Sequence, residues 1–145
     1  MANAVTIRRA IPEEAATLTQ IALDAKRYWG YPEHWIQHWE SDLTISSDFI
    51  REHHVYVADD DGEVRGFYAL CVGDSKAELE HMWVTPASIG TGVGKELFLD
   101  GMERAATLNV NAVELSADPN AAGFYSRMGA TQIGETDSVI DGHVR

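Results

Sequence analysis

The apolar stretch from Val64 to Val72, set between two short turns, constrains the fold of this chain most. A strand that is apolar along most of its length is typically buried on both faces of a sheet. The residues before it, 59–62, read Asp-Asp-Asp-Gly, and those after it, 73–75, read Gly-Asp-Ser. Both sets favour tight turns, so we expect the strands 54–58, 64–72 and 77–84 to be antiparallel neighbours.

Helices and further strands are predicted on either side of these three strands. A strand is expected over 5–8, and Pro12 begins a helix whose apolar residues recur every three or four positions. Its apolar face comprises Ile11, Ala15, Leu18, Ala22, Ala25 and Trp29. Helical pieces over 33–54, a helix after the glycines at 90–94, a strand over 112–116, a short helix ending at 128 and short strands over 131–145 complete the chain. This order predicts a single α/β domain, residues 1–145, with a mixed sheet.

The charge of the chain limits the classes of partner. Its 145 residues include 23 acidic and 11 basic side chains, a formal net charge of −12. Nucleic acids and anionic membranes both require a basic surface, so we expect neither as a partner. Residues 31–82 alone contain twelve acidic and three basic side chains. That excess is a modest indication of a cationic partner, although solubility is the commoner reason for surface carboxylates.

The cysteine content and the N-terminus indicate a reducing compartment. Cys71 is the single cysteine, so it forms no disulfide within the chain, and its apolar surroundings favour a buried structural role. The first residues lack the pattern of a signal peptide, and no apolar run reaches the ~20 residues of a membrane-spanning helix. We therefore expect a cytoplasmic protein.

Glycines at 90, 92 and 94 lie between the strand that ends at Val84 and the following helix. Without Cβ atoms, successive N–H groups can point into one concavity, and the helix N-terminus adds partial positive charge, which suits a phosphate or pyrophosphate. The spacing does not match a P-loop, since Ile89 stands at its first glycine and Glu96 at its hydroxyl residue. It does not match the dinucleotide-binding pattern either, whose third glycine would come one residue later. A flexible turn is the simpler alternative.

A second motif, Asn-Ala-Ala-Gly-Phe-Tyr-Ser-Arg-Met-Gly, covers residues 120–129. With the glycine cluster about 25 residues upstream, it resembles the GCN5-related N-acetyltransferase (GNAT) family over roughly residues 5–134. That family transfers an acetyl group from acetyl-coenzyme A to a primary amine. The resemblance implies a mixed, mostly antiparallel sheet flanked by helices, in which a splayed pair of strands forms the acetyl-coenzyme A channel.

The resemblance also implies roles for individual residues. Asn120 would contact the pantetheine arm, and Tyr125 would protonate the leaving thiolate, unless it is only a packed aromatic residue. Arg127 is either a contact to a phosphate of coenzyme A or a solvated helix residue. The implied cofactor-binding set comprises the strand backbone at Met82, Trp83 and Val84, the loop residues Gly90, Thr91, Gly92, Val93, Gly94 and Lys95, and Asn120, Tyr125 and Arg127.

Two departures from the family pattern change what is expected. Ile89 stands where the family usually has Arg or Gln, so the loop keeps its backbone N–H groups but lacks one side-chain contact to phosphate. The last strand, 138–145, is shorter than in most relatives. It is then either incomplete or supplied by a partner chain, which leaves room for a homodimer.

Glu80 is the first candidate for the base that takes a proton from the acceptor ammonium. Strand alternation predicts that Glu80 shares a face with Met82 and Val84, opposite Leu79 and His81. Relatives often have a glutamate on this strand that acts directly or through water, although an exposed carboxylate without a role is the alternative. His81 is the rival base because histidine titrates near neutral pH. A backbone N–H near residue 84 is the candidate donor to the thioester oxygen.

Aromatic and histidine side chains crowd residues 28–39, where relatives have the wall of the acceptor pocket. Because aromatic faces attract ammonium groups, we expect Trp29, Tyr31 and Trp35, together with Glu80, to bind the acceptor. Simple packing of these rings is the alternative. The histidines at 34 and 38 lack a third ligand at a helical step, so we expect no metal.

The sequence therefore predicts an acetyl-coenzyme A-dependent N-acetyltransferase that acts on a small cationic primary amine. We expect direct transfer within a ternary complex, without a covalent enzyme intermediate, because Cys71 is poorly placed for one. Two alternatives remain open. One is a non-catalytic acyl-coenzyme A-binding sensor, and the other is an enzyme that acetylates protein lysines or N-termini.

Overall fold

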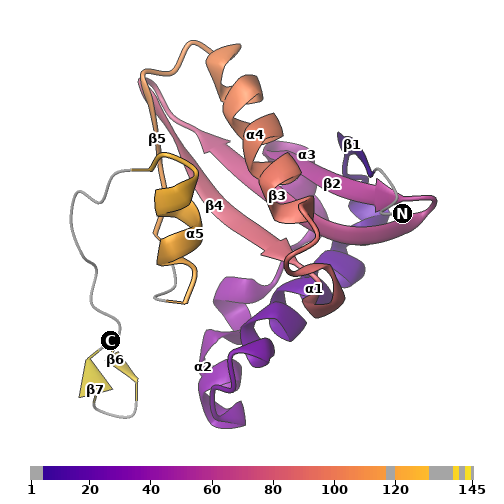
Figure 1. Ribbon diagram of the computed structural model, residues 1–145, viewed down its shortest axis with the longest axis vertical. Helices are drawn as coiled ribbons and strands as arrows, with labels where there is room; N and C mark the ends of the chain where they lie inside the picture. The colour runs from indigo at the N-terminus through magenta and orange to yellow at the C-terminus, as the bar shows by residue number, and fades with distance from the viewer. Residues whose placement is uncertain (1–4, 117–119, 131–138, 141–142, 145) are drawn as a thin grey trace.

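The computed structural model describes residues 5–116, 120–130, 139–140 and 143–144, which are organised around a five-stranded sheet (Figure 1). The sheet has the order β1-β2-β3-β4-β5. The first four strands are antiparallel neighbours, and β5 lies parallel to β4, which confirms the mixed, mostly antiparallel sheet that the sequence predicts. The strands are β1 Thr6–Arg9, β2 His54–Asp60, β3 Glu63–Val72, β4 Lys76–Val84 and β5 Ala112–Glu114.

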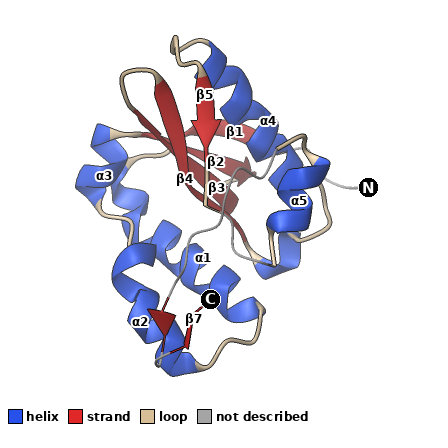
Figure 2. Ribbon diagram, turned by 90° about the vertical axis from the view of Figure 1, so that its left-hand side faces the viewer, coloured by secondary structure: helices blue, strands red, loops and turns tan. Residues whose placement is uncertain are grey.

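Helices cover both faces of the sheet (Figure 2). One face packs against α1 and α3, and the other packs against α4, beside which α5 lies. The helices are the 3-10 helix η1 Pro12–Glu14, α1 Ala15–Tyr28, α2 Glu33–Leu43, α3 Ser47–Glu52, the 3-10 helix η2 Pro86–Ser88, α4 Val93–Ala106 and α5 Ala122–Arg127. None of the helices in the described ranges is long and apolar enough to cross a membrane.

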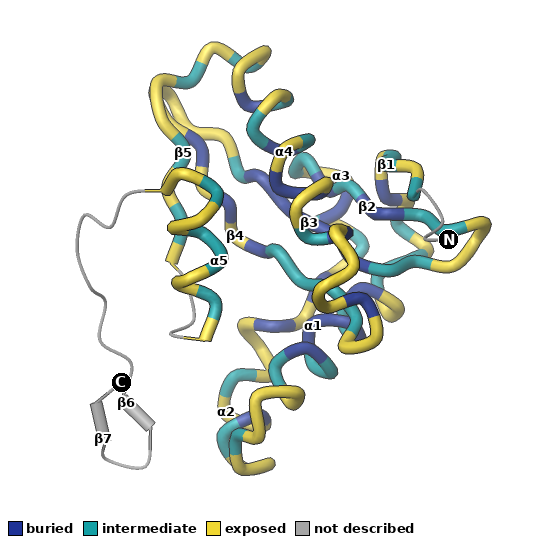
Figure 3. Tube along the Cα trace, viewed as in Figure 1, coloured by how far each residue is buried: buried dark blue, intermediate teal, exposed yellow. Residues whose placement is uncertain are grey.

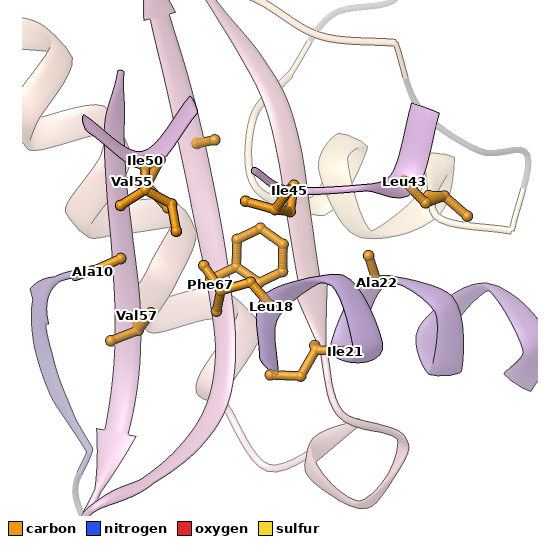
Figure 4. Packing of buried hydrophobic residues seen from close by; sticks show 11 residues of the cluster. Ala10, Leu18, Ile21, Ala22, Leu43, Ile45, Ile50, Val55, Val57 and Phe67 are labelled. Carbon is orange, nitrogen blue, oxygen red and sulfur yellow. The ribbon is translucent and has the colours of Figure 1, made fainter. Parts of the chain in front are cut away.

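The central residues of β3 are buried, as its apolar sequence predicts (Figure 3). Their side chains lie on both faces of the sheet and divide the interior into two clusters. Phe67 and Ala69 point to the α1 side and pack with Leu18 of α1 and Val57 of β2; we call this the first cluster (Figure 4). Tyr68 and Leu70, with the opposite alternation, pack against Leu97 and Phe98 of α4 in the second cluster.

The predicted apolar face of the first helix is confirmed at its centre and wrong at its ends. Leu18, Ala22 and Ala25 are buried, but Ile11 is 50% exposed and Trp29 is 40% exposed. The cause is the length of the helix, because α1 begins only at Ala15 and ends at Tyr28. Both mispredicted residues therefore lie outside its regular turns.

The C-terminal segment is described only in part. The strands β6, Val139–Ile140, and β7, His143–Val144, pair with each other in a ladder separate from the five-stranded sheet. The expected last strand over 138–145 otherwise lies outside the described residues, so its completion by a partner chain stays a prediction.

Candidate active site

The site begins where β4 and β5 separate (Figure 1). The two strands pair in parallel only between Lys76–Glu78 and Ala112–Glu114, whereas β4 continues to Val84. Among the described residues, no strand pairs with this edge of β4 beyond Glu78. The predicted splayed pair of strands is therefore present, with β4 on one side and β5 and α5 on the other.

The open edge of β4 presents alternate backbone groups. The N–H of Thr85 donates to the carbonyl of Arg65 at 2.9 Å. This bond shows which residues of β4 direct their backbone groups toward β3. In an antiparallel ladder only every second residue bonds to a given neighbour, so the N–H and C=O groups of Met82 and Val84 turn toward the opening. Because backbone polar groups need partners, this edge suits an extended ligand that carries amides.

A β-bulge in β4 decides where Glu80 lies. Ala69 of β3 pairs with His81 and Leu70 pairs with Leu79, so Glu80 is an extra residue in β4. Such an insertion reverses the alternation of faces along the strand. The prediction that Leu79 shares a face with His81 is therefore wrong, and Leu79 packs in the second cluster instead.

The same bulge turns Glu80 away from the face of Met82 and Val84, contrary to the predicted alternation. The Sγ of Cys71 donates to Oε2 of Glu80 at 2.9 Å. Cys71 follows Phe67 of the first cluster by an even number of residues, so both face the α1 side. Glu80 is exposed there, and an exposed carboxylate with one oxygen held in place can take a proton from an approaching ammonium.

His81, the rival base, is buried in an aromatic environment. It is 7% exposed, and burial lowers its pKa. The indole Nε1–H of Trp83 donates to Nδ1 of His81 at 3.1 Å. Because Nδ1 accepts this bond, it carries no proton of its own. Its ring lies 5.7 Å from that of Phe49 and 6.2 Å from that of Phe67. This enclosure favours a structural role for His81, and of the two candidate bases only Glu80 is exposed.

Cys71 is not suited to nucleophilic attack. Burial and the neighbouring Glu80 carboxylate raise the pKa of its thiol to about 12. The thiol therefore stays protonated at neutral pH, and only a thiolate is a strong nucleophile. This agrees with a direct transfer that has no covalent enzyme intermediate.

The glycine loop lies directly before α4. Gly90 and Gly92 have φ values of 80° and 94°, in the left-handed region that glycine occupies without strain. Gly92 caps α4, so the N–H groups of Val93, Gly94 and Lys95 form the first turn, which has no intrahelical acceptors. Thr91 is also exposed, and its hydroxyl donates to the carbonyl of Ser88 at 2.5 Å.

Gly94 connects this loop to the opening. A Cβ at Gly94 would lie 3.6 Å from the Phe124 ring of α5 and 3.8 Å from Cε of Met82. The loop, the open edge of β4 and the start of α5 therefore meet at one place. Parts of the predicted cofactor site that are far apart in the sequence therefore lie together here.

Tyr125 is half-buried between aromatic rings. Its ring centroid is 5.9 Å from that of Phe98 and 5.2 Å from that of Phe124. Burial raises the pKa of Tyr125 to about 12, so its hydroxyl keeps its proton throughout the neutral range.

Arg127 is exposed, and its side chain lies back along its own helix. Its guanidinium is close to Gly123, where an added Cβ would come within 3.3 Å of it. Among the described residues, no side-chain hydrogen bond or ion pair joins Arg127 to the glycine loop.

The predicted acceptor residues separate into two groups. Tyr31, Trp35 and Trp39 form one group, which we call the aromatic cluster, with centroid distances of 5.1 to 6.1 Å. The Nζ of Lys26 lies 4.2 Å from the Trp39 ring centroid and 5.1 Å from that of Tyr31. Trp29 lies outside the cluster and packs edge-on against Tyr28.

The predicted acceptor set omits Trp39 of this cluster and Lys26, whose ammonium lies over two of its rings. The spacing of four between Trp35 and Trp39 is the signal that identifies Trp39. Asn120 joins the cluster to the cofactor side, because its Nδ2 donates to the hydroxyl of Tyr31 at 2.9 Å.

A cavity of about 320 Å³ lies at the other end of β4, near the β3–β4 turn. The ammonium of Lys76 and the carboxylate of Glu114 form an ion pair of 3.1 Å beside it. The lining residues are Cys71, Val72, Gly73, Lys76, Ala77, Glu78 and Glu114. In the part of the chain that the structure describes, no three His, Cys, Asp or Glu side chains are grouped to hold a metal ion.

Comparison with known proteins identifies a family and a relative that are both described as acetyltransferases. The profile of the Acetyltransferase (GNAT) family matches residues 16–130. A 5-NmdU N-acetyltransferase from Pseudomonas phage PaMx11 is 30% identical over 139 residues, which span 91% of this chain and 91% of that protein.

Two solved structures have the same fold. A GNAT family acetyltransferase from Brucella melitensis, in complex with acetyl-CoA, is 25% identical with a TM-score of 0.68, covering 88% of this chain and 83% of that one. The PaiA N-acetyltransferase from Thermoplasma acidophilum, in complex with coenzyme A, is 21% identical with a TM-score of 0.77, covering 97% and 92%.

Proposed function

The chain belongs to the acetyltransferase (GNAT) family and is an acetyl-coenzyme A-dependent N-acetyltransferase, and from this premise we propose that its acceptor is a small cationic primary amine. The observation that carries the proposal is the bulge in β4, which turns the exposed Glu80 carboxylate outward next to the opening between β4 and β5. Twelve of the 23 acidic residues lie in segment 31–82, which agrees with a cationic acceptor on this side.

The proposed cofactor site fits the chemistry of coenzyme A. The backbone of Met82 and Val84 would pair with amides of the pantetheine arm, and the first-turn N–H groups of α4, with Lys95, would hold the pyrophosphate. A Cβ at Gly94 would lie in ordinary contact with Met82 and Phe124, so the absence of a side chain keeps this junction open. Acetyl-coenzyme A, when bound there, supplies the activated acetyl thioester.

Each step of the transfer then has a candidate group. Glu80, directly or through water, takes a proton from the acceptor ammonium and frees its lone pair. The N–H of Val84, on the open edge, donates to the thioester oxygen as negative charge develops there. The Tyr125 hydroxyl, which keeps its proton because burial raises its pKa, donates that proton to the departing sulfur.

An amine on a modified nucleotide is the second candidate acceptor. It is favoured by the 30% identity to the phage 5-NmdU N-acetyltransferase. The chemistry at the amine would be the same, and only the groups that recognise the rest of the acceptor would differ. The net charge of −12 disfavours a long polyanion, so the second candidate is tested best with a single nucleoside or nucleotide.

A panel of amines with acetyl-coenzyme A, assayed by release of free thiol, tests the proposal. The panel contains monoamines, diamines, polyamines, 5-NmdU nucleoside and nucleotide, and a lysine-containing peptide. We expect small cationic amines to raise thiol release most. Greatest stimulation by the 5-NmdU compounds would select the second candidate, and stimulation by the peptide alone would overturn both.

A further inference from the structure

One side-chain hydrogen bond connects the cofactor side of the site to the acceptor side. The Nδ2 of Asn120 donates to the hydroxyl of Tyr31 at 2.9 Å, and the two residues are 89 positions apart in the sequence. Asn120 lies just before α5, the helix whose Phe124 faces Gly94 of the glycine loop, whereas Tyr31 lies in the connection between α1 and α2. A contact between such distant segments fixes the position of one relative to the other.

Tyr31 is itself held in place by its neighbours. Gly30 before it has a φ of 81°, which allows the tight exit from α1, and Pro32 after it caps α2 with its fixed φ. Its ring stacks on Trp35 at 6.0 Å with an interplanar angle of 27°. The Lys26 ammonium lies 5.1 Å from the Tyr31 ring centroid. The hydroxyl of Tyr31 is therefore presented from a fixed position.

Because the asparagine amide is planar, the bond to Tyr31 also orients the other end of the Asn120 side chain. An amide group has a donor end and an acceptor end in one plane. When the Nδ2 end is bonded to Tyr31, the orientation of the Oδ1 end is fixed as well. An Oδ1 with a fixed orientation can accept a hydrogen bond from an amide N–H of the pantetheine arm without first losing rotational freedom.

We propose that Tyr31 is a positioning residue that orients Asn120 for coenzyme A and so couples the cofactor site to the aromatic cluster. The inference rests on the proposed role of Asn120 as a contact of the pantetheine arm. Coupling of this kind is reciprocal, so coenzyme A that engages Asn120 also favours the bonded position of Tyr31. The acceptor side is then most completely ordered when the cofactor is bound.

A double-mutant cycle on coenzyme A binding tests this proposal. The dissociation constant is measured by calorimetry for the wild type, Tyr31→Phe, Asn120→Ala and the double variant. Loss of one hydrogen bond corresponds to a weakening of about 3- to 10-fold, which we expect for Tyr31→Phe. Because Tyr31 acts through Asn120, the double variant should bind no more weakly than Asn120→Ala alone. The KM for acetyl-coenzyme A should rise in Tyr31→Phe while kcat changes little.

Controls separate this role from a merely structural one. Tyr28→Phe removes a hydroxyl from an exposed tyrosine of the same region that packs on Trp29, and it should leave the dissociation constant unchanged. Binding is compared at a temperature at which the melting curves show both Tyr28→Phe and Tyr31→Phe to be fully folded. Additive losses in the double variant, or unchanged binding in Tyr31→Phe, would overturn the proposal.

The same data keep this inference distinct from the proposed function. Additive losses together with normal acetylation of a small amine would remove the Tyr31 coupling and leave the proposed acceptor class intact. Non-additive losses with no acetylation of any small amine would support the coupling and overturn the acceptor class.

Discussion

Two polar residues on neighbouring central strands, Tyr68 of β3 and Glu80 of β4, have opposite surroundings. Tyr68 is fully buried, and its hydroxyl donates to Asp100 at 2.5 Å and accepts from Nε of Arg104 at 3.2 Å. The Arg104 guanidinium also lies 3.8 Å from the Tyr56 ring centroid. Glu80 is exposed at a bulge and is held at one oxygen by Cys71.

The difference shows what each position contributes. The Tyr68 group attaches α4 to the sheet with its polar atoms paired, as buried polar groups require. The bulge instead turns Glu80 out of the ladder and next to the open edge of β4. We therefore expect substitutions at the first position to change stability and substitutions at the second to change catalysis.

Glu80→Gln should have the largest effect on rate. Loss of the base should lower kcat/KM by about 100-fold or more, because a positioned general base contributes this much. The free energy of unfolding should stay the same, since Glu80 is exposed. Glu78→Gln, an exposed neighbour on the same strand, is the matched control and should retain activity. Equal rates for both variants would remove the proposed role of Glu80.

Tyr125→Phe should have the next largest effect on rate. Loss of the proton donor should lower kcat by about 10- to 100-fold, while the dissociation constant of acetyl-coenzyme A changes little. Turnover and calorimetric binding measured side by side check this. If binding weakens in proportion to the loss of rate, Tyr125 contributes to binding and not to proton transfer.

Tyr68→Phe should show the opposite pattern, with a change in stability and little change in rate. Removal of the hydroxyl takes one hydrogen-bond partner from Asp100 and one from Arg104, which then keep only their bond to each other, and this should cost about 1–3 kcal/mol in the free energy of unfolding. Urea denaturation measures this, with Tyr56→Phe as a control that keeps the Tyr68 bonds. An unchanged midpoint would contradict the proposed attachment of α4.

Alkaline pH should cause the most gradual change, and one in stability alone. Burial raises the pKa of both Cys71 and Tyr125 to about 12, above their ordinary values of 9.0 and 10.0. A group whose pKa is higher in the folded state stabilises the fold below its unfolded pKa and loses that contribution as pH rises through its folded pKa. The free energy of unfolding should therefore fall between about pH 9 and about pH 12.

Urea titrations at successive pH values measure this decline. In Cys71→Ser the fall should begin nearer pH 10.0, the ordinary pKa of tyrosine, because the thiol no longer contributes. A free energy that stays constant up to pH 12 would show that these groups are not buried as described.

The parts of the site that could be predicted from sequence are local. Gly90 and Gly92 have the left-handed backbone that their place before a helix indicates, and α4 begins directly after them. The sheet order follows from short turns around β3, which allow only antiparallel neighbours. In each case the determining residues lie within a few positions of one another.

The parts that could not be predicted depend on contacts between distant segments. The bulge at Glu80 is set by the register of β4 against β3, so alternation within β4 alone gives the wrong face. The bond between Asn120 and Tyr31 and the place of Lys26 over Trp39 require the folded arrangement of α1, α2 and α5. Trp29 shows a different and local limit, since its exposure follows from where α1 ends.

The central claim is that Glu80 is the base, and the pH dependence of kcat/KM tests it most directly. The measurement compares the wild type with Glu80→Gln on the amine that responds most strongly in the panel. We predict that the wild-type rate rises with pH and that this rising limb is flattened in Glu80→Gln. A rising limb of the same shape and midpoint in both proteins would contradict the account.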